Sequence, residues 1–252
     1  MTIRYELNPP KVKEESLLSH EDLENALQKL KERVLKIEKL CHGIHITDSV
    51  LGIPRISPIT TGTLIRNHNS KMEITVSLRV RDRNLTSLAQ SISDAVLLGL
   101  NGILILKGDP PPEGPKDSKL VPSQVVKYFK QLSLGEKIDL FLSLPSNPNF
   151  DKIHNKIEAK PTGFVTQVIH SVQQVSRIVD YLKPQGFKII PCILLPSKEN
   201  APSAKYLNLD WSSYSDNPID FIKEIHKIAG DVLITSPNDF NGAYETFTKL
   251  AS

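Results

Sequence analysis

The sequence predicts an α/β fold, a single (β/α)8 barrel, because strand-like and helix-like segments alternate along the whole 252-residue chain. Several strand-like runs are apolar on both faces, as in ILIL at 103–106, which is the pattern of parallel strands covered by helices. No Ser/Gly-rich linker or fixed-period repeat divides the chain, so one domain over residues 1–252 is expected. The eight runs, all rich in β-branched or aliphatic residues, lie at 3–7, 43–47, 73–79, 102–106, 138–144, 163–167, 187–194 and 231–235.

Segments with a helical period separate these runs. The clearest is an apolar stripe over 23–40, which follows a start signal at Ser19 and Asp22. A second stripe, over 88–96, begins at Asn84 or Thr86. Further helices are predicted at 172–182 and 218–225 and, from weaker patterns, near 122–132, 151–159 and 238–250.

An open, doubly wound sheet is the competing architecture. It produces the same alternation, because periodicity does not show whether a sheet closes. The sequence contains no GxGxxG motif, which weakens the dinucleotide-binding form of that fold. Eight units favour the closed barrel, which is common at about 250 residues.

The composition is that of an ordinary globular protein and argues against several classes of function. A formal charge of +3 is too small to indicate nucleic-acid binding. No apolar run approaches the roughly 18 residues of a membrane span, and the polar start lacks a signal-peptide core, so a cytoplasmic location is expected. Cys41 and Cys192 form no CxxC pair, and the seven histidines show no HxH or HExxH spacing, so no metal site is predicted.

Polar residues within or just after the strands are the candidates for chemistry, because the reactive groups of such barrels gather at the carboxyl ends of the strands. Glu6 lies inside the first strand. If it points into the barrel, loss of solvation raises its pKa and suits it to act as a general acid. The alternative is a surface glutamate near a terminus. Asp109 follows the fourth strand, where it is either a ligand-facing carboxylate or a turn residue.

Other polar residues occupy the same expected rim. Thr47 and Asp48 end the second strand, the segment RVRDRN at 79–84 follows the third, and Gln167 ends the sixth. RVRDRN is equally consistent with a solvated turn. Lys156 lies in the helix between the fifth and sixth strands, where it either meets a phosphate or is simply solvated.

Four segments, taken in order, resemble the flavin-dependent methylenetetrahydrofolate reductases. They are RYELNPPK, HITDSVLGIPRISPI, the stretch from SLRVRDRN to ILILKGDPPP, and NPNFDKIHNKIEAKPTGFVTQ. The resemblance runs with gaps from residue 2 to about residue 195. The family fold is also a (β/α)8 barrel, in agreement with the strand count.

The resemblance implies a role for each matching residue. Glu6 is expected to protonate N10 of the folate, Asp109 to contact the pterin close to the flavin, and Gln167 to hydrogen-bond the pterin. Lys156 is expected to meet the flavin pyrophosphate. The positions that resemble flavin contacts are Thr47, Ser77, Arg79, Lys107, Gly108, Leu144, Asn149 and Lys156.

The implied cofactors are FAD and, as electron donor, NADH or NADPH, and the implied substrate is a reduced folate or related pterin of one-carbon metabolism and methionine biosynthesis. Ser77 replaces the family's strand-three histidine, and Leu144 replaces its strand-five aromatic residue. The final strand also lacks the family's substrate-facing arginine. The alternative is therefore a flavin-free, pterin-binding or electron-relay subunit of a larger complex. A homo-oligomer or a redox partner subunit is compatible with both hypotheses.

Overall fold

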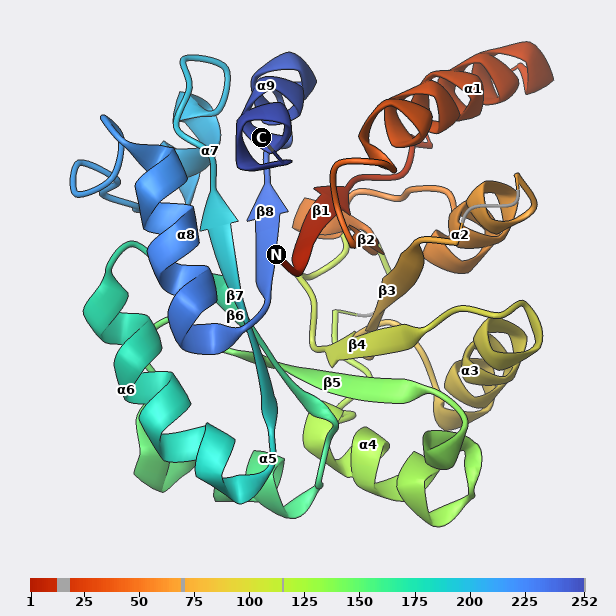
Figure 1. Cartoon of the computed structure of the whole chain (residues 1–252). Helices are drawn as coiled ribbons and strands as arrows, with labels where there is room; N and C mark the ends of the chain where they lie inside the picture. Colours follow the sequence, from red (N-terminus) through yellow and green to blue (C-terminus); the bar gives the residue numbers. More distant parts are fainter. Residues whose placement is uncertain (13–18, 69–70, 115, 252) are drawn as a thin grey trace.

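In the computed structural model, eight strands close into a barrel in the order of the sequence (Figure 1). The structure describes residues 1–12, 19–68, 71–114 and 116–251. Each strand pairs in parallel with the next, and β8 pairs in parallel with β1. The strands are β1 (Ile3–Leu7), β2 (Gly43–Ile46), β3 (Glu73–Arg79), β4 (Gly102–Leu106), β5 (Asp139–Leu144), β6 (Gly163–Val168), β7 (Lys188–Leu194) and β8 (Val232–Thr235). The predicted closed barrel is confirmed, and the open sheet is wrong.

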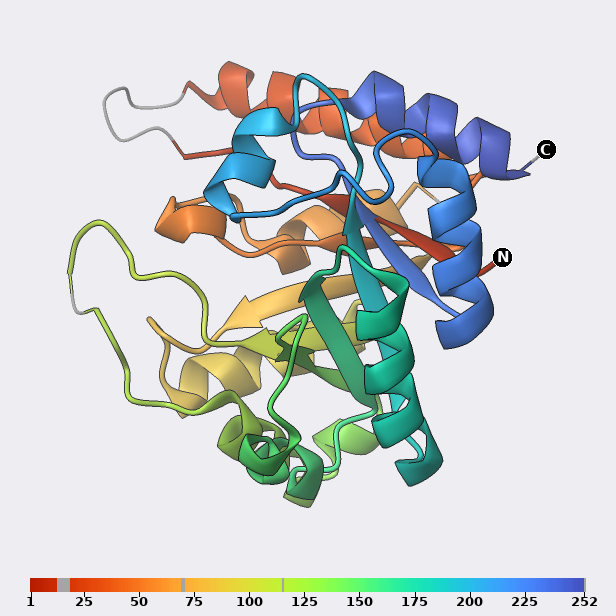
Figure 2. The same cartoon turned by 90° about the vertical axis from the view of Figure 1, so that its left-hand side faces the viewer.

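Helices surround the barrel and cover its outer face (Figure 1). They are α1 (His20–Ile37), α2 (Pro58–Arg66), α3 (Leu85–Leu97), α4 (Pro122–Gln131), α5 (His154–Glu158), α6 (Val172–Leu182), α7 (Ala201–Tyr206), α8 (Pro218–Ala229) and α9 (Phe240–Ala251). Figure 2 shows α1 and α9 side by side, so the last helix of the chain packs beside the first. The segment between β4 and α4 extends away from the barrel in the same view.

Two helices begin at the caps that the sequence predicts. Ser19 caps α1 by accepting a hydrogen bond from the amide of Asp22, and Asn84 caps α3 in the same way. Two helices, α2 and α7, were not predicted. The sequence of α2, PITTGTLIR, is rich in β-branched residues and contains a glycine, so its intrinsic helix propensity is low. Tertiary packing overrides that propensity, because α2 lies against β3 and buries Ile59 and Ile65.

Inside the barrel, polar and apolar side chains occupy different halves. Strands β4 to β8 contribute an apolar cluster of Leu104, Phe141, Val165, Ile190, Cys192 and Leu233. Strands β1 to β3 contribute Arg4, His45 and Thr75, which face that cluster across a small internal cavity. Since side chains alternate along a strand, Glu6 and Ser77 point inward two residues further on. The chemistry-bearing groups of the interior therefore come mainly from the first three strands.

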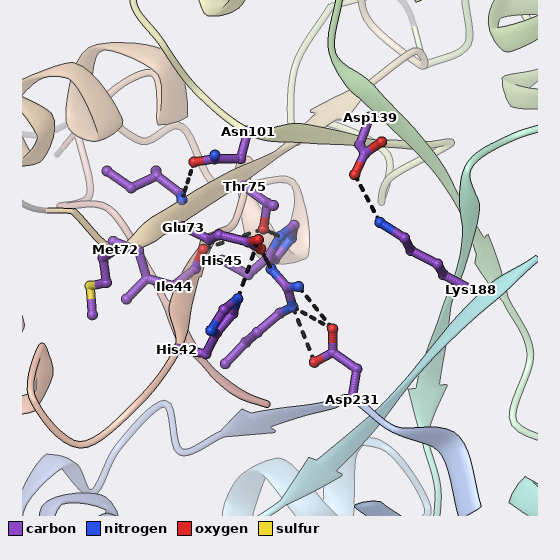
Figure 3. Close-up of polar contacts among 12 residues, drawn as sticks. His42, Ile44, His45, Met72, Glu73, Thr75, Asn101, Asp139, Lys188 and Asp231 are labelled. Atoms are coloured by element: carbon purple, nitrogen blue, oxygen red, sulfur yellow. Dashed lines mark hydrogen bonds and ion pairs between the residues drawn. The ribbon is translucent and has the colours of Figure 1, made fainter. Parts of the chain in front are cut away.

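Ion pairs close the amino end of the barrel (Figure 3). The guanidinium of Arg4 lies 2.6 Å from Glu73 Oε2 and 2.8 Å from Asp231 Oδ2. His42 Nε2 lies 3.2 Å from the other oxygen of Glu73. Burial alone would raise the pKa of Glu73, but the nearby guanidinium of Arg4 outweighs it, and the pKa is lowered. The open end of the interior is thus the carboxyl end of the strands.

Replacing Arg4 tests whether this cluster stabilises the fold. We expect Arg4→Met to lower the free energy of unfolding by about 3 kcal/mol, because it leaves the carboxylate of Asp231 without its counter-charge in a largely buried place. Urea denaturation measures the change. Lys188→Met is the control, since Lys188 is largely exposed and pairs with Asp139 at the same end of the barrel. Its expected cost is below about 1 kcal/mol, and equal costs in the two variants would contradict the account.

Candidate active site

Glu6 lies at the carboxyl end of β1 and is not a freely solvated surface residue. Its Oε1 accepts a hydrogen bond of 2.7 Å from Thr235 Oγ1 at the end of β8. Burial raises the pKa of the Glu6 carboxyl, and the hydrogen bond from Thr235 opposes part of that rise. A carboxyl in this setting keeps its proton to a higher pH than a solvated glutamate, which is the property a general acid needs.

A neutral histidine lies beneath this carboxyl, on the neighbouring strand. His45 Nδ1 is 2.9 Å from Thr75 Oγ1, and its Nε2 is 2.8 Å from Ser77 Oγ. Burial lowers the pKa of His45 to about 3, so the ring is uncharged at neutral pH. Because Thr75 Oγ1 also donates to the carbonyl of Ile44, we assign the Nδ1 proton to the bond with Thr75 and the Nε2 lone pair to the Ser77 hydroxyl.

The segment RVRDRN is a scaffold and not a solvated turn. Asp48 accepts hydrogen bonds from the amide of Arg79 at 3.0 Å and from Arg83 Nη1 at 2.6 Å. Arg79 donates to the carbonyl of Ser49 and to Asp82. These bonds tie the end of β3 to the loop after β2. The segment therefore fixes the shape of the rim around the barrel interior.

The loop after β4 is held by the same segment. Arg81 Nε donates to the carbonyl of Gly108 at 2.8 Å, and its Nη1 donates to the carbonyl of Lys116. Gly108 has φ of +80°, and a Cβ there would lie 2.9 Å from Cγ of Arg79. This positive φ, which glycine adopts without strain, turns the chain sharply after β4 and brings the loop backbone against Arg79.

Asp109 is exposed and joins two loops. Its Oδ2 accepts a 3.0 Å hydrogen bond from the amide of Leu51. Leu51 has φ of +61° and lies beside Gly52, a position where a Cβ would overlap the carbonyl of Pro110. A residue other than glycine is strained in this left-handed conformation. It stays there only where surrounding contacts hold its backbone in place. Asp109 thus fixes the turn over Val50–Gly52 against the loop after β4.

Gln167 lies near the end of β6, and Lys156 lies in α5, between β5 and β6. Gln167 is exposed in β6, next to an irregularity in the pairing with β7. Lys156 Nζ donates to the carbonyl of Ser143 at 2.5 Å, and burial lowers the pKa of this amine. Among the described residues, no carboxylate pairs with Lys156. A half-buried amine without an acidic partner is suited to an anionic ligand.

The family assignment rests on most of the chain. The sequence profile described as methylenetetrahydrofolate reductase matches residues 1–229. The chain belongs to the methylenetetrahydrofolate reductase family. This confirms the resemblance seen in the four ordered segments, and it supports an oxidoreductase with a folate-related substrate.

Several solved structures of other proteins have a fold similar to that of this chain. Riboflavin lyase RcaE, described with modified FMN and the substrate riboflavin, has a TM-score of 0.63 at 9% identity, covering 99% of this chain and 90% of its own. QR15, an aldolase, has a TM-score of 0.58 at 12% identity, with coverages of 98% and 96%. Deoxyribose phosphate aldolase from Aeropyrum pernix has a TM-score of 0.54 at 11% identity, with coverages of 98% and 90%. At these identities the likeness shows the fold alone. No curated protein matches the chain.

Three candidate residues lie on the rim where the phosphates of a flavin, the cofactor that methylenetetrahydrofolate reductases generally use, are expected. Arg79 is 1% exposed, and its Nε is buried without a hydrogen-bond partner among the described residues. Lys156 adds a cation without a carboxylate partner. Asn149 is exposed after β5, where its side chain accepts from the amide of Asp151. Lys156 supplies the positive charge and Asn149 a polar group that suit a pyrophosphate, whereas the charge of Arg79 is paired with Asp82.

Other positions from the family pattern are engaged elsewhere. Leu144 is fully buried in the layer between the strands and the helices, so its side chain points away from the barrel interior. Since side chains alternate, Ser143 is the inward residue there. Lys107 pairs with Asp117 at 2.7 Å on the surface, and the Thr47 hydroxyl donates to Asn8.

Thr235 is a further residue of the candidate site. Thr235 contacts Glu6 but was not among the predicted residues, although it is a polar residue at the end of an otherwise apolar run.

Within the described ranges, no group of three or more His, Cys, Asp or Glu side chains is placed to hold a metal ion. In those same ranges, no helix has both the length and the apolar character needed to cross a membrane.

The pH dependence of stability tests the environment of Glu6. Because its folded pKa is raised, the folded state binds the proton more tightly than the unfolded state, and ionisation destabilises the fold as pH rises above the ordinary glutamate pKa. We expect Glu6→Gln to raise the unfolding temperature at pH 8 and to leave it nearly unchanged at pH 4. Thermal unfolding at the two pH values measures this.

The control for that measurement is Glu224→Gln, at an exposed position on α8. It is expected to change the two unfolding temperatures equally. A Glu6→Gln variant that behaves like this control at both pH values would show that Glu6 is solvated.

Proposed function

We propose that the protein is a flavin-dependent reductase that converts 5,10-methylenetetrahydrofolate, or a related modified pterin, to the 5-methyl form. The observation that carries the proposal is the half-buried carboxyl of Glu6, with its raised pKa, at the carboxyl end of a methylenetetrahydrofolate reductase barrel. A proton donor at this place is the group that opening of the substrate's five-membered ring requires.

When bound and reduced by NADH or NADPH, FAD would supply the hydride for the methylene carbon. Glu6 gives its proton to N10 of the substrate. The bond between N10 and the methylene carbon then breaks, its electron pair stays on N10, and the methylene group becomes an electrophilic iminium at N5. The remaining carboxylate of Glu6 keeps the hydrogen bond from Thr235.

Residues on the rim bind and orient the reactants in this proposal. Gln167 is exposed at the end of β6 and offers both a donor and an acceptor to the pterin. Asp109 has one oxygen on the amide of Leu51 and uses the other for the pterin. Lys156 meets the flavin phosphates, and Arg79, Gly108 and Asn149 are the other proposed flavin positions on the rim, Arg79 with its charge already paired to Asp82. Thr47 and Ser77 act through their hydroxyl oxygens, since their protons are donated within the protein.

A second function, a flavin-free pterin-binding or electron-relay subunit, is favoured by specific departures. Leu144 faces the outer layer, and Lys107 is held in an ion pair. Both positions resemble flavin contacts in the sequence, yet neither offers its side chain to a ligand here. An absorbance spectrum before and after addition of FAD separates the two functions: bound flavin supports the reductase, and a colourless protein that takes up no flavin supports the relay subunit.

Glu6→Gln separates the two half-reactions. We expect methylene reduction to fall by at least about 100-fold, because the amide cannot supply the proton. Reduction of bound flavin by NADPH or NADH is expected to stay within about 3-fold of the unmodified protein, since hydride transfer to flavin does not use this proton. Stopped-flow absorbance follows each half-reaction. Equal losses in both half-reactions would contradict the assignment of Glu6 as the acid.

Lys156→Met tests the charge expected at the flavin phosphates. We expect FAD to bind about tenfold more weakly, because a charge-assisted hydrogen bond to a phosphate is lost. Fluorescence titration of the apoprotein with FAD gives the dissociation constant. The control is Lys152→Met, since Lys152 is an exposed lysine four residues before Lys156 and is expected to leave FAD binding unchanged. Equal weakening in both variants would indicate a general charge effect.

A further inference from the structure

The proposed acid contacts a residue from the other end of the chain. Glu6 and Thr235 lie on β1 and β8, which are neighbours only because the barrel closes. Thr235 Oγ1 is 2.7 Å from Glu6 Oε1, and the Thr235 side chain is buried. This is a short, direct hydrogen bond in a place that excludes most water.

The bond makes the two carboxyl oxygens of Glu6 unequal. The Thr235 hydroxyl donates to Oε1, whereas Oε2 has no partner among the described residues. In a protonated carboxyl, the carbonyl oxygen accepts hydrogen bonds and the hydroxyl oxygen donates. The proton therefore belongs on Oε2, the oxygen that is free to meet a ligand.

The backbone of Thr235 is fixed from both sides. Its carbonyl accepts a 3.0 Å hydrogen bond from the amide of Leu195, just after β7. The next residue, Ser236, is held by the buried side chain of Asn200 at 2.8 Å and by the hydroxyl of Tyr5. The β-branched side chain of Thr235 has few rotamers. The hydroxyl is thus presented to Glu6 in one direction.

Arg4, the inward cation two residues before Glu6 on β1, is paired with carboxylates at the amino end of the barrel. The other titratable groups near Glu6 are neutral. On β7, burial raises the pKa of the Cys192 thiol, and the charge of Glu6 adds to that rise. On β1, burial raises the pKa of the Tyr5 phenol. On β2, His45 pairs in register with Glu6, and burial lowers its pKa to about 3. The Thr235 hydroxyl is therefore the neighbouring group that stabilises the ionised form of Glu6.

We propose that Thr235 is the positioning residue for the acid: it fixes Oε1, directs the proton on Oε2 toward the substrate, and stabilises the carboxylate left after proton transfer. In that step the Oε2–H bond breaks and the N10–H bond forms, while the electron pair of the broken N10–carbon bond stays on N10. The inference rests on the proposed function for the identity of the proton acceptor. The pairing of Thr235 with Glu6 does not depend on the proposed function.

The first test needs no substrate. Infrared difference spectra, with Glu6→Gln used to assign the Glu6 carboxyl band, give the pH midpoint of its titration in the purified protein. We expect Thr235→Val, which keeps the shape and removes the donor, to move the midpoint to higher pH. Thr235→Ser, which keeps the hydroxyl, is expected to leave the midpoint near that of the unmodified protein. An unchanged midpoint in Thr235→Val would overturn the proposal.

Thr235→Ala gives the same comparison if the valine variant does not fold. It also lacks the donor, so its midpoint is expected to move in the same direction. An alanine variant whose midpoint matches that of Thr235→Ser would likewise overturn the proposal.

The second test follows kcat/KM for methylene reduction against pH. An acid catalyst loses activity above its pKa, so Thr235→Val should move the alkaline limb to higher pH and lower the rate on the acidic plateau about tenfold, with rescue by Thr235→Ser. Equal losses in both variants without a shifted limb would show that Thr235 only packs. A shifted titration in a protein that reduces no methylene-pterin would retain the Glu6–Thr235 pairing and refute the proposed function.

Discussion

Closure of β8 onto β1 is the constraint on which the rest of the structure depends. The barrel has no exposed edge strand, because each of its eight strands pairs with a neighbour on both sides. Closure brings Arg4 next to Asp231 at one end of the barrel and Glu6 next to Thr235 at the other. The same seam therefore supplies both the ion pairs that close the amino end and the hydrogen bond that orients the proposed acid.

The division of the interior into polar and apolar halves explains why the pKa of Glu6 is raised. The apolar cluster from β4 to β8 lowers the local polarity, and the one histidine that pairs with Glu6 in register is held uncharged. The positive charges near the carboxyl end are held on the rim, where Arg79 and Arg83 pair with Asp82 and Asp48. Burial in this environment favours the neutral carboxyl and raises the pKa of Glu6.

Local sequence patterns predicted the strands well because a strand in this fold is buried on both faces and reads as an apolar run. Each predicted strand agrees with the structure to within one residue at either end. The helix α2 was missed because its stability comes from packing against β3 and not from propensity. Asp109 shows the limit for the site: its bond to the amide of Leu51 depends on two loops meeting in space, which spacing along the chain does not encode. Thr235 was missed for the same reason, since its partner lies 229 residues away.

The central claim is that this barrel transfers hydride from reduced flavin to a methylene-pterin. The most direct measurement is an anaerobic single turnover, in which protein with photoreduced FAD is mixed with 5,10-methylenetetrahydrofolate. The account predicts that the flavin absorbance returns as one equivalent of the 5-methyl product forms. Flavin that binds, stays reduced and yields no methyl product with this folate or a modified pterin analogue would contradict it.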